Sequence, residues 1–315
     1  MTETGQPDYM RLLPRATTAS LSRLELTTRG AMEGFVTGRH TSPYKGFSVE
    51  FAEHRQYVPG DDIRDLDWRV YGKSDRYYIK QFIEETNLRA TLLVDASGSM
   101  AYAGKQAAPL PENGGKPASK FEYAQHLAAA LSYLLIRQQD AVGIATFDTA
   151  MRRYLPARSR GSHLRALLQE LHNTSTGNES RLAPIFHDIA DRIRRRGLVI
   201  ILSDLFDKAD EILKALHHFR YRKHEVILFH VTAEEELTFP YSKWTRFKDL
   251  ENASNELQLD PRSIRAEYLD RFRAHVAQIE KGCGEMTIDY VPMCTKDPYD
   301  LTLANYLGER LSRIK

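Results

Sequence analysis

The sequence of 315 residues predicts an α/β protein with a mostly parallel sheet and helices on both faces. Two observations predict this fold class. Short apolar runs alternate along the chain with longer runs in which apolar residues recur every three or four positions. The short runs lack the polar alternation of half-exposed strands, as is typical of strands covered on both faces. A Rossmann-like order of strand, helix and strand accounts for both observations.

The apolar runs predict the strands of this sheet. The clearest are four runs, each followed by polar residues: 89–95, 141–147, 197–203 and 225–231. Weaker segments at 151–155 and 286–293 are expected to add an edge strand and a fifth strand. The amphipathic runs between them predict helices at 119–138, 162–171, 182–194, 209–219, 264–279 and 301–314. Ligands of such sheets bind at the carboxyl ends of the strands, where the strand order reverses.

The first 88 residues follow a different pattern. Residues 20–35 predict a helix, and residues 76–84 alternate partly between polar and apolar, as an exposed strand does. We therefore divide the chain into residues 1–88, an N-terminal helix with a small β-containing region, and residues 89–315, the α/β domain. The sequence leaves open whether the first region is an independent domain.

The composition narrows the class of protein. Lys and Arg number 44 against 42 Asp and Glu, a formal net charge of +2, so no nucleic-acid partner is expected. No apolar run approaches the roughly 18–20 residues of a spanning helix, so no membrane insertion is expected. Two cysteines cannot form a disulfide framework, and no secretory signal is visible. These observations predict a cytoplasmic protein.

The strongest chemical signal is the run Asp95-Ala96-Ser97-Gly98-Ser99, which follows the first predicted strand. A carboxylate and two hydroxyls at alternate positions of a tight loop can converge on a hard cation such as Mg²⁺. Asp204 follows the third clear strand and lies at the same edge if the two strands are neighbours. The alternative interpretation is that these polar residues only cap the next helix.

The pattern D-x-S-x-S after an apolar strand resembles the metal-ion-dependent adhesion site of the von Willebrand factor A domain. The resemblance implies that Asp95, Ser97, Ser99 and Asp204 hold Mg²⁺ or Mn²⁺, directly or through water. The family's second loop supplies a Thr, and Ser180 is the matching hydroxyl here. Leu205 stands where many relatives have Gly.

A second motif, the run from Arg55 to Trp68 (RQYVPGDDIRDLDW), makes the resemblance more specific. It is similar to a hallmark of bacterial von Willebrand A-like proteins associated with MoxR-type AAA+ ATPases. That resemblance implies a non-enzymatic scaffold that acts with such an ATPase in the assembly or maturation of an unknown client protein. From the residues alone, the same run is a salt-bridged turn with Trp68 buried, or a charged docking surface.

Two other functions stay open at this point. The first is a scaffold of the same fold that holds no metal. The second is a Mg²⁺-dependent hydrolase, in which Asp148 would be the base and Thr146 a weak nucleophile. The sequence contains no complete phosphate-binding loop and no G-x-S-x-G elbow, so neither ATP hydrolysis nor α/β-hydrolase chemistry is expected.

Overall fold

We describe the protein from a computed structural model. It describes residues 8–14, 17–19, 21, 49–59, 63, 66–84, 88–110, 115–177, 182–193, 195–251 and 255–314. The predicted helix at 20–35 and several residues of the 55–68 motif lie outside these ranges. The chain divides into two compact units, residues 36–87 and residues 1–35 with 88–315.

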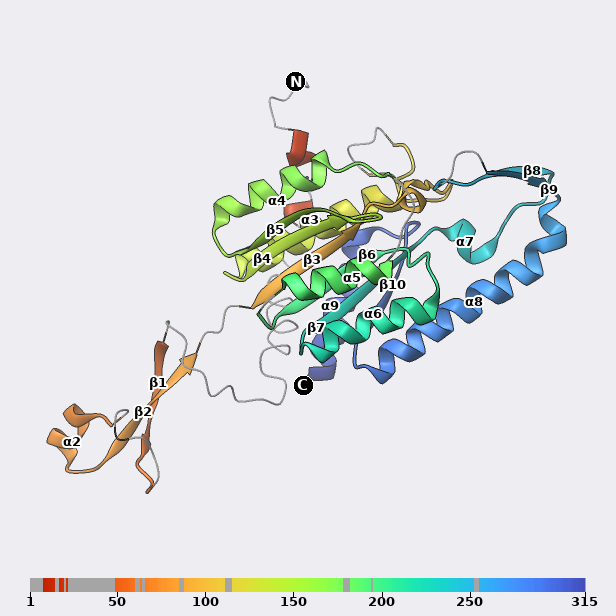
Figure 1. Cartoon of the computed structure of the whole chain (residues 1–315). Helices are drawn as coiled ribbons and strands as arrows, with labels where there is room; N and C mark the ends of the chain where they lie inside the picture. The colour runs from red at the N-terminus through yellow and green to blue at the C-terminus, as the bar shows by residue number, and fades with distance from the viewer. Residues whose placement is uncertain are drawn as a thin grey trace. The chain divides into compact units, whose positions relative to one another are not determined.

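The larger unit is built on a six-stranded, mostly parallel sheet (Figure 1). The strands are β3 (Arg89–Asp95), β4 (Ala141–Phe147), β5 (Met151–Arg158), β6 (Leu198–Ser203), β7 (Glu225–Thr232) and β10 (Asp289–Cys294). Their order is β10-β7-β6-β3-β4-β5, and only β5 runs antiparallel to its neighbour. The direction of strand order therefore reverses between β3 and β6. Such a switch point leaves a crevice at the carboxyl edge of the sheet.

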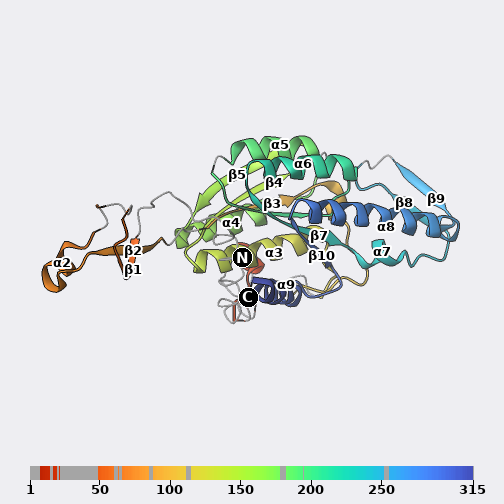
Figure 2. The ribbon, with the colours of Figure 1, turned by 90° about the horizontal axis from the view of Figure 1, so that it is seen from below.

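Helices cover both faces of this sheet, as the sequence predicts (Figure 2). The helices of the larger unit are α3 (Lys120–Arg137), α4 (Gly161–Asn173), α5 (Leu182–Arg192), α6 (Ala209–Tyr221), α7 (Glu234–Thr238), α8 (Pro261–Glu285) and α9 (Tyr299–Ile314). Short 3₁₀ helices lie at Asp8–Leu12 and Gly98–Ala101. One apolar core contains side chains of α3, α4 and α9, and the other contains side chains of α5, α6 and α8.

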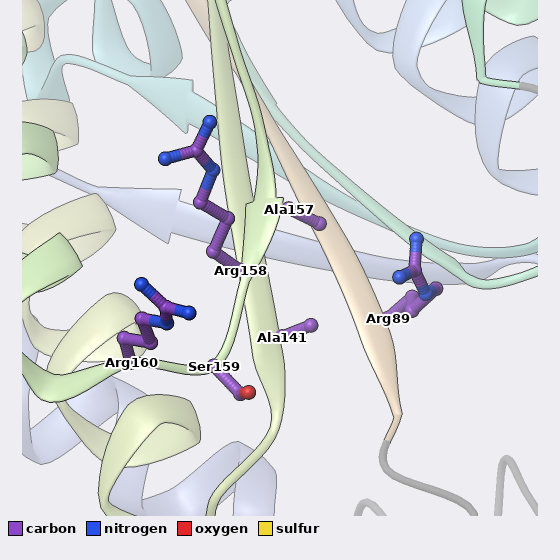
Figure 3. A pocket seen from close by; sticks show the side chains of 6 residues that line it. All are labelled: Arg89, Ala141, Ala157, Arg158, Ser159 and Arg160. Carbon is purple, nitrogen blue, oxygen red and sulfur yellow. The ribbon is translucent and has the colours of Figure 1, made fainter.

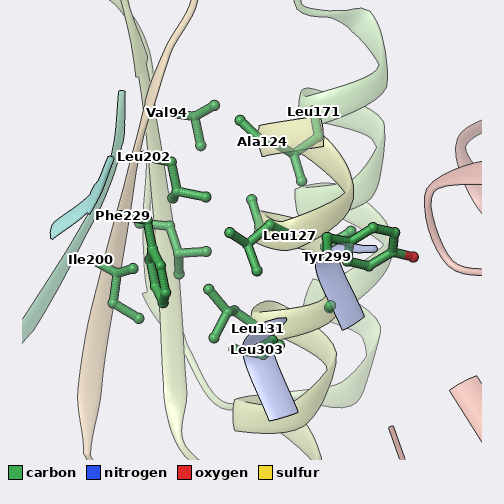
Figure 4. Packing of buried hydrophobic residues seen from close by; sticks show 14 of the residues in the cluster. Val94, Ala124, Leu127, Leu131, Leu171, Ile200, Leu202, Phe229, Tyr299 and Leu303 are labelled. Atoms are coloured by element: carbon green, nitrogen blue, oxygen red, sulfur yellow. The ribbon is translucent and has the colours of Figure 1, made fainter. Parts of the chain in front are cut away.

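Helix α3 lies in the centre of the first core. Ser119 caps it with a full capping box: the Ser119 side chain accepts from the Glu122 backbone N–H, and the Glu122 side chain accepts from the Ser119 backbone N–H. Leu127 and Leu131 of α3 face Val94 and Leu202 of the sheet in Figure 4, and all four are fully buried. Each face of the sheet needs apolar side chains at every second residue. Because helices cover both faces, β3 and β6 are unbroken apolar runs in the sequence.

A two-stranded ribbon and a short helix interrupt the alternation after β7. Helix α7 is followed by β8 (Thr245–Lys248) and β9 (Glu256–Leu259), which pair antiparallel before α8 begins. The sequence analysis did not predict α7, β8 or β9. It also predicted α8 too short, since the helix starts at Pro261, where Asp260 caps it, and runs to Glu285.

The smaller unit contains a hairpin and one short helix. Strand β1 (Val49–Gln56) pairs antiparallel with β2 (Tyr78–Glu84), and α2 (Trp68–Ser74) lies between them in the sequence. Asp67 is buried and accepts hydrogen bonds from the backbone N–H groups of Arg69 and Val70, so it caps α2. The prediction that Trp68 is buried is wrong: its side chain is 60% exposed, because it is the first residue of a solvent-facing helix.

Within the described part of the chain, no helix is both long enough and apolar enough to cross a membrane.

Candidate functional site at the strand switch point

The candidate site lies where β3 and β6 end side by side. These strands pair parallel with Val94 opposite Leu202, so Asp95 and Ser203 are the next residues at the same edge. The Ser203 hydroxyl donates a hydrogen bond of 2.5 Å to Oδ2 of Asp95. Asp95 is completely buried. The sequence prediction depends on β3 and β6 being neighbours, and they are.

The loop after β3 brings the two predicted serines together. The backbone N–H of Ser97 donates to Oδ1 of Asp95 at 2.9 Å, which folds the loop back over the carboxylate. The hydroxyls of Ser97 and Ser99 lie 3.1 Å apart. Ser97 is buried and Ser99 is partly exposed, so the hydroxyl pair leads from the carboxylate toward solvent.

Asp204 lies beside this group and is bound by a lysine. Lys120 Nζ, at the start of α3, donates to Asp204 Oδ2 at 2.7 Å and to Glu236 Oε1 of α7 at 2.6 Å. The Lys120 side chain is only 2% exposed. Burial alone would lower the pKa of Lys120, but the charges of Asp204 and Glu236 outweigh it and raise that pKa above its ordinary value. The lysine is therefore a permanent cation in the site.

Two histidines hold the backbone turn that carries Asp204. Burial lowers the pKa of His230 to about 4, so its ring is neutral. Its Nε2–H donates to the Asp204 carbonyl at 3.0 Å, which leaves Nδ1 to accept from the Tyr290 hydroxyl at 2.6 Å. His275 Nε2 lies 3.1 Å from the Leu205 carbonyl oxygen.

Leu205 itself adopts the left-handed backbone region, with φ of 54°. Glycine adopts this conformation without the steric cost that a side chain brings. Here the side chain of Leu205 is fully buried in the second core. The apolar burial and the contact from His275 offset the backbone strain.

The second predicted loop also reaches the site. The Gly177 backbone N–H donates to the Ala96 carbonyl at 2.9 Å, so the chain just before residue 178 lies against the first loop. Ser180, the predicted second-loop ligand, lies outside the described residues. The neighbouring Asp148 forms an ion pair with Arg152.

The ionisable side chains at this edge of the sheet carry a net negative charge. When all are ionised, the three carboxylates of Asp95, Asp204 and Glu236 and the ammonium of Lys120 sum to a formal charge of −2. One Mg²⁺ would neutralise this charge. Burial, and then the charge of Asp204, raise the pKa of Asp95 to about 7. Among the described side chains no cation forms an ion pair with Asp95. A cation at this point would remove the cost of burying a charged carboxylate.

Among the described residues, no three or more His, Cys, Asp and Glu side chains lie together in a way that could hold a metal ion. The candidate ligand set is instead rich in hydroxyls, as Mg²⁺ accepts. The sequence analysis named Asp95, Ser97, Ser99 and Asp204 as candidates, and did not name Lys120, Ser203 or Glu236, which the structure places around them. A lysine at the first position of a helix, where a cation is disfavoured by the helix dipole, was the available signal for Lys120.

A separate pocket of about 410 Å³ lies at the amino end of β3, far along the sheet from the Asp95 loop. Arg89, Arg158 and Arg160 line it. Figure 3 shows that Arg158 and Arg160 point to one side of the strands and Arg89 to the other. The three guanidinium groups do not converge, so the pocket offers no single anion-binding centre.

Comparison with known proteins shows the family of this chain. A family model described as "Protein of unknown function DUF58" matches residues 53–278. The chain belongs to the DUF58 family. The match includes both the 55–68 motif and the four described site residues, Asp95, Ser97, Ser99 and Asp204.

Among curated relatives, this DUF58 chain is 27% identical over 275 residues to uncharacterized protein Rv1480 of Mycobacterium tuberculosis and equally to uncharacterized protein Mb1516 of Mycobacterium bovis. These alignments cover 84% of this chain and 82% of each relative.

Two solved structures show a weaker likeness. The hypothetical protein BatB of Bacteroides thetaiotaomicron matches with 16% identity and a TM-score of 0.46, over 72% of this chain and 98% of that one. An aerotolerance-related membrane protein of Bacteroides fragilis matches with 13% identity and a TM-score of 0.47, over 72% and 99%.

Proposed function

We propose that this DUF58 protein is a non-enzymatic, metal-dependent scaffold with a von Willebrand factor A-like domain. The proposal is supported by the loop that brings Asp95, Ser97 and Ser99 together and by Asp204 at the same edge of the sheet, where its charge acts on Asp95. Convergence of this kind is what a metal-ion-dependent adhesion site requires. The strand order, with its reversal between β3 and β6, supports the fold assignment.

The proposed ligands are Asp95, Ser97, Ser99, Ser180 and Asp204, the last directly or through water, and the proposed ion is Mg²⁺ or Mn²⁺. When bound, the ion would supply an open coordination position for a carboxylate of a partner protein. The chain's own part is to hold the hydroxyl pair and the buried carboxylate in place, through the Ser97 N–H and the Ser203 hydroxyl. Recognition would then depend on both metal and partner.

The proposed partners are a MoxR-type AAA+ ATPase and an unknown client protein. Support comes from the resemblance of the 55–68 motif, which lies inside the region matched by the DUF58 model. The proposal includes a cytoplasmic location, which the two free thiols, Cys283 and Cys294, support because reducing compartments keep thiols unpaired.

The surroundings of Asp148 favour a binding module over a hydrolase. Arg152 donates two hydrogen bonds to Asp148 Oδ2, at 2.9 Å from Nε and 2.5 Å from Nη2. Burial opposes ionisation of Asp148, but these bonds outweigh it and lower its pKa. A carboxylate neutralised in this way is a poor general base, because a base near neutral pH needs a raised pKa.

Thermal unfolding with and without Mg²⁺ tests the proposal. A site that binds only the folded chain stabilises it by about 2.7 kcal/mol at a free ion concentration one hundred times Kd. Asp95→Asn should abolish this shift, whereas Asp270→Asn, on an exposed face of α8, should preserve it. Capture of a MoxR-type ATPase from the same genome should need both Mg²⁺ and Asp95.

Lys120 favours a second candidate, a scaffold of the same fold without metal. Its ammonium already lies 2.7 Å from the Asp204 carboxylate and provides one positive charge there. A metal-free scaffold predicts that EDTA changes neither the melting temperature nor capture of the ATPase. The same melts therefore separate the two candidates.

A further inference from the structure

The lysine of the candidate site binds two carboxylates at once. Lys120 Nζ donates to Asp204 Oδ2 at 2.7 Å and to Glu236 Oε1 at 2.6 Å. The side chains of Lys120 and Asp204 are almost fully shielded from water, at 2% and 3% exposure, whereas that of Glu236 is 25% exposed. The ammonium of Lys120 therefore lies between a buried acceptor and a half-buried one.

Asp204, the buried acceptor, is held in a fixed position. Its Oδ1 accepts from the Phe206 backbone N–H at 3.3 Å, while its Oδ2 accepts from Lys120. The Nε2–H of His230 donates to the Asp204 backbone carbonyl at 3.0 Å, so the backbone that carries this carboxylate is fixed as well. A metal ion that takes Asp204 as a ligand would consequently meet the ammonium of Lys120 on the same carboxylate.

Glu236, the half-buried acceptor, gives this ammonium a second position. Glu236 Oε2 accepts from the Ala233 backbone N–H at 2.7 Å, in the cap of α7, while Oε1 faces Lys120. Because the cap holds the Glu236 carboxylate in place, the ammonium can stay bound to Glu236 alone. Only a small movement of the lysine side chain is needed, since the same Nζ atom already contacts both carboxylates.

We propose that Lys120 competes with the metal ion for Asp204, and that Glu236 keeps the ammonium when the ion binds. The inference rests on the function proposed above and adds how the affinity of that site for metal is set. Two cations on one carboxylate repel each other, so each weakens the binding of the other. The apparent affinity for metal is then reduced by the fraction of molecules in which Lys120 occupies Asp204.

Isothermal titration of the full-length protein with Mn²⁺ tests the competition. Lys120→Met removes the competitor, so the dissociation constant for Mn²⁺ should fall on the order of tenfold, as is usual for coupled sites. A lysine that only orients Asp204 predicts the opposite, because its loss would weaken binding. Lys296→Met is the matched control: it removes the same charge from a pair with Glu234 of α7, at 3.3 Å, and should leave the dissociation constant close to that of wild type.

Glu236→Gln tests the same competition while the pair of Lys120 and Asp204 stays intact. Without the second carboxylate the ammonium remains on Asp204, so the dissociation constant for Mn²⁺ should rise on the order of tenfold. The amide oxygen of the new side chain can still accept the N–H that caps α7, so the fold should be kept. Glu234→Gln makes the same charge change on the same helix and should leave the dissociation constant close to that of wild type.

The double variant Lys120→Met/Glu236→Gln distinguishes competition from an effect of net charge. If net charge alone sets the affinity, Glu236→Gln weakens Mn²⁺ binding equally in wild type and in the Lys120→Met background. If Lys120 competes, Glu236→Gln weakens binding only where Lys120 is present. Equal effects in the two backgrounds overturn the inference. If Lys120→Met does not fold, equal dissociation constants for Glu236→Gln and Glu234→Gln overturn it.

The outcomes separate this inference from the proposed function. If wild type binds Mn²⁺, Asp95→Asn does not, and the double variant shows no coupling, the metal site stands and only the present inference is wrong. If Lys120→Met binds Mn²⁺ and wild type does not, the competition is supported and the metal-dependent function proposed for the wild type is wrong. If neither wild type nor any variant binds Mn²⁺, both proposals are wrong.

Discussion

Replacement of Lys120 by Met removes the cation that lies between Asp204 and Glu236 in the candidate site. The Lys120 Nζ lies 2.7 Å from Asp204 and 2.6 Å from Glu236, and its side chain is 2% exposed. Met keeps most of the length of the aliphatic stem, so the packing at the start of α3 changes little. The main effect of the substitution is that the carboxylates of Asp204 and Glu236 keep their charge but lose their counter-ion.

The size of the effect follows from the burial of the partners. Removal of one member of a buried ion pair costs about 3–5 kcal/mol. Asp204 is 3% exposed at its side chain and would bear the full cost, while Glu236, at 25%, can turn toward water. We therefore expect the free energy of unfolding to fall by about 3 kcal/mol, near the lower end of this range. That is a large share of the roughly 5–15 kcal/mol by which a typical protein is stable.

The assay is urea unfolding followed by circular dichroism in EDTA. Lys120→Met should lose about 3 kcal/mol, and the double variant Lys120→Met/Asp204→Asn should recover part of it, because the uncompensated charge is gone. Lys214→Met is the matched control: its ion pair with Glu211 is exposed, and a change within about 0.5 kcal/mol is expected. A loss below about 1 kcal/mol for Lys120→Met would show that the buried pair is not formed.

Three further predictions test the loop contact, the core and the pH response. Gly98→Ala forces the new Cβ against the Leu250 carbonyl, so we expect a loss of about 1–3 kcal/mol and faster proteolysis near residue 250, whereas Gly72→Ala, with nothing within 4 Å, should do neither. Leu127→Ala removes a fully buried side chain of α3 and should cost about 2–5 kcal/mol in urea unfolding; a loss under 1 kcal/mol would place Leu127 outside the core. Burial lowers the pKa of His224, so the unfolded chain binds this proton more readily and stability should fall as the pH drops through about 6.5. Urea midpoints at pH 7 and pH 5 should show this fall in wild type and a smaller one in His224→Gln, and equal falls would contradict the assignment.

The alternation of buried strands and amphipathic helices could be predicted from the sequence, because which residues of each element are apolar depends only on which of them are buried. Residues 89–95 and 141–147 form β3 and β4 with the predicted limits, and α3 differs from its predicted range by one residue at each end. Fully apolar strands need no knowledge of their neighbours to be recognised. Neighbouring strands β3 and β6 then bring Asp95 and Asp204 to one edge, which follows from topology.

The features that the sequence did not predict depend on partners distant in the chain. Lys120 is an unfavourable residue for the first turn of a helix, but its partner Asp204 lies 84 positions later in the chain, so the sequence alone does not reveal the pair. The β8 and β9 strands are four residues each and mostly exposed, so no apolar period marks them. The burial of Trp68 was mispredicted for the same reason: aromatic character predicts burial only where a neighbouring element covers the residue.

Both borders of the central sheet discourage the addition of a foreign strand. Border strand β5 carries Pro156, border strand β10 carries Pro292, and proline has no N–H to offer to a new neighbour. Arg153 and Arg158 on β5 add exposed charge along one of these borders. The protein should consequently resist fibril-like stacking at high concentration. A partner protein would have to recognise side chains and loops, because the two prolines hinder pairing of its backbone with either border strand.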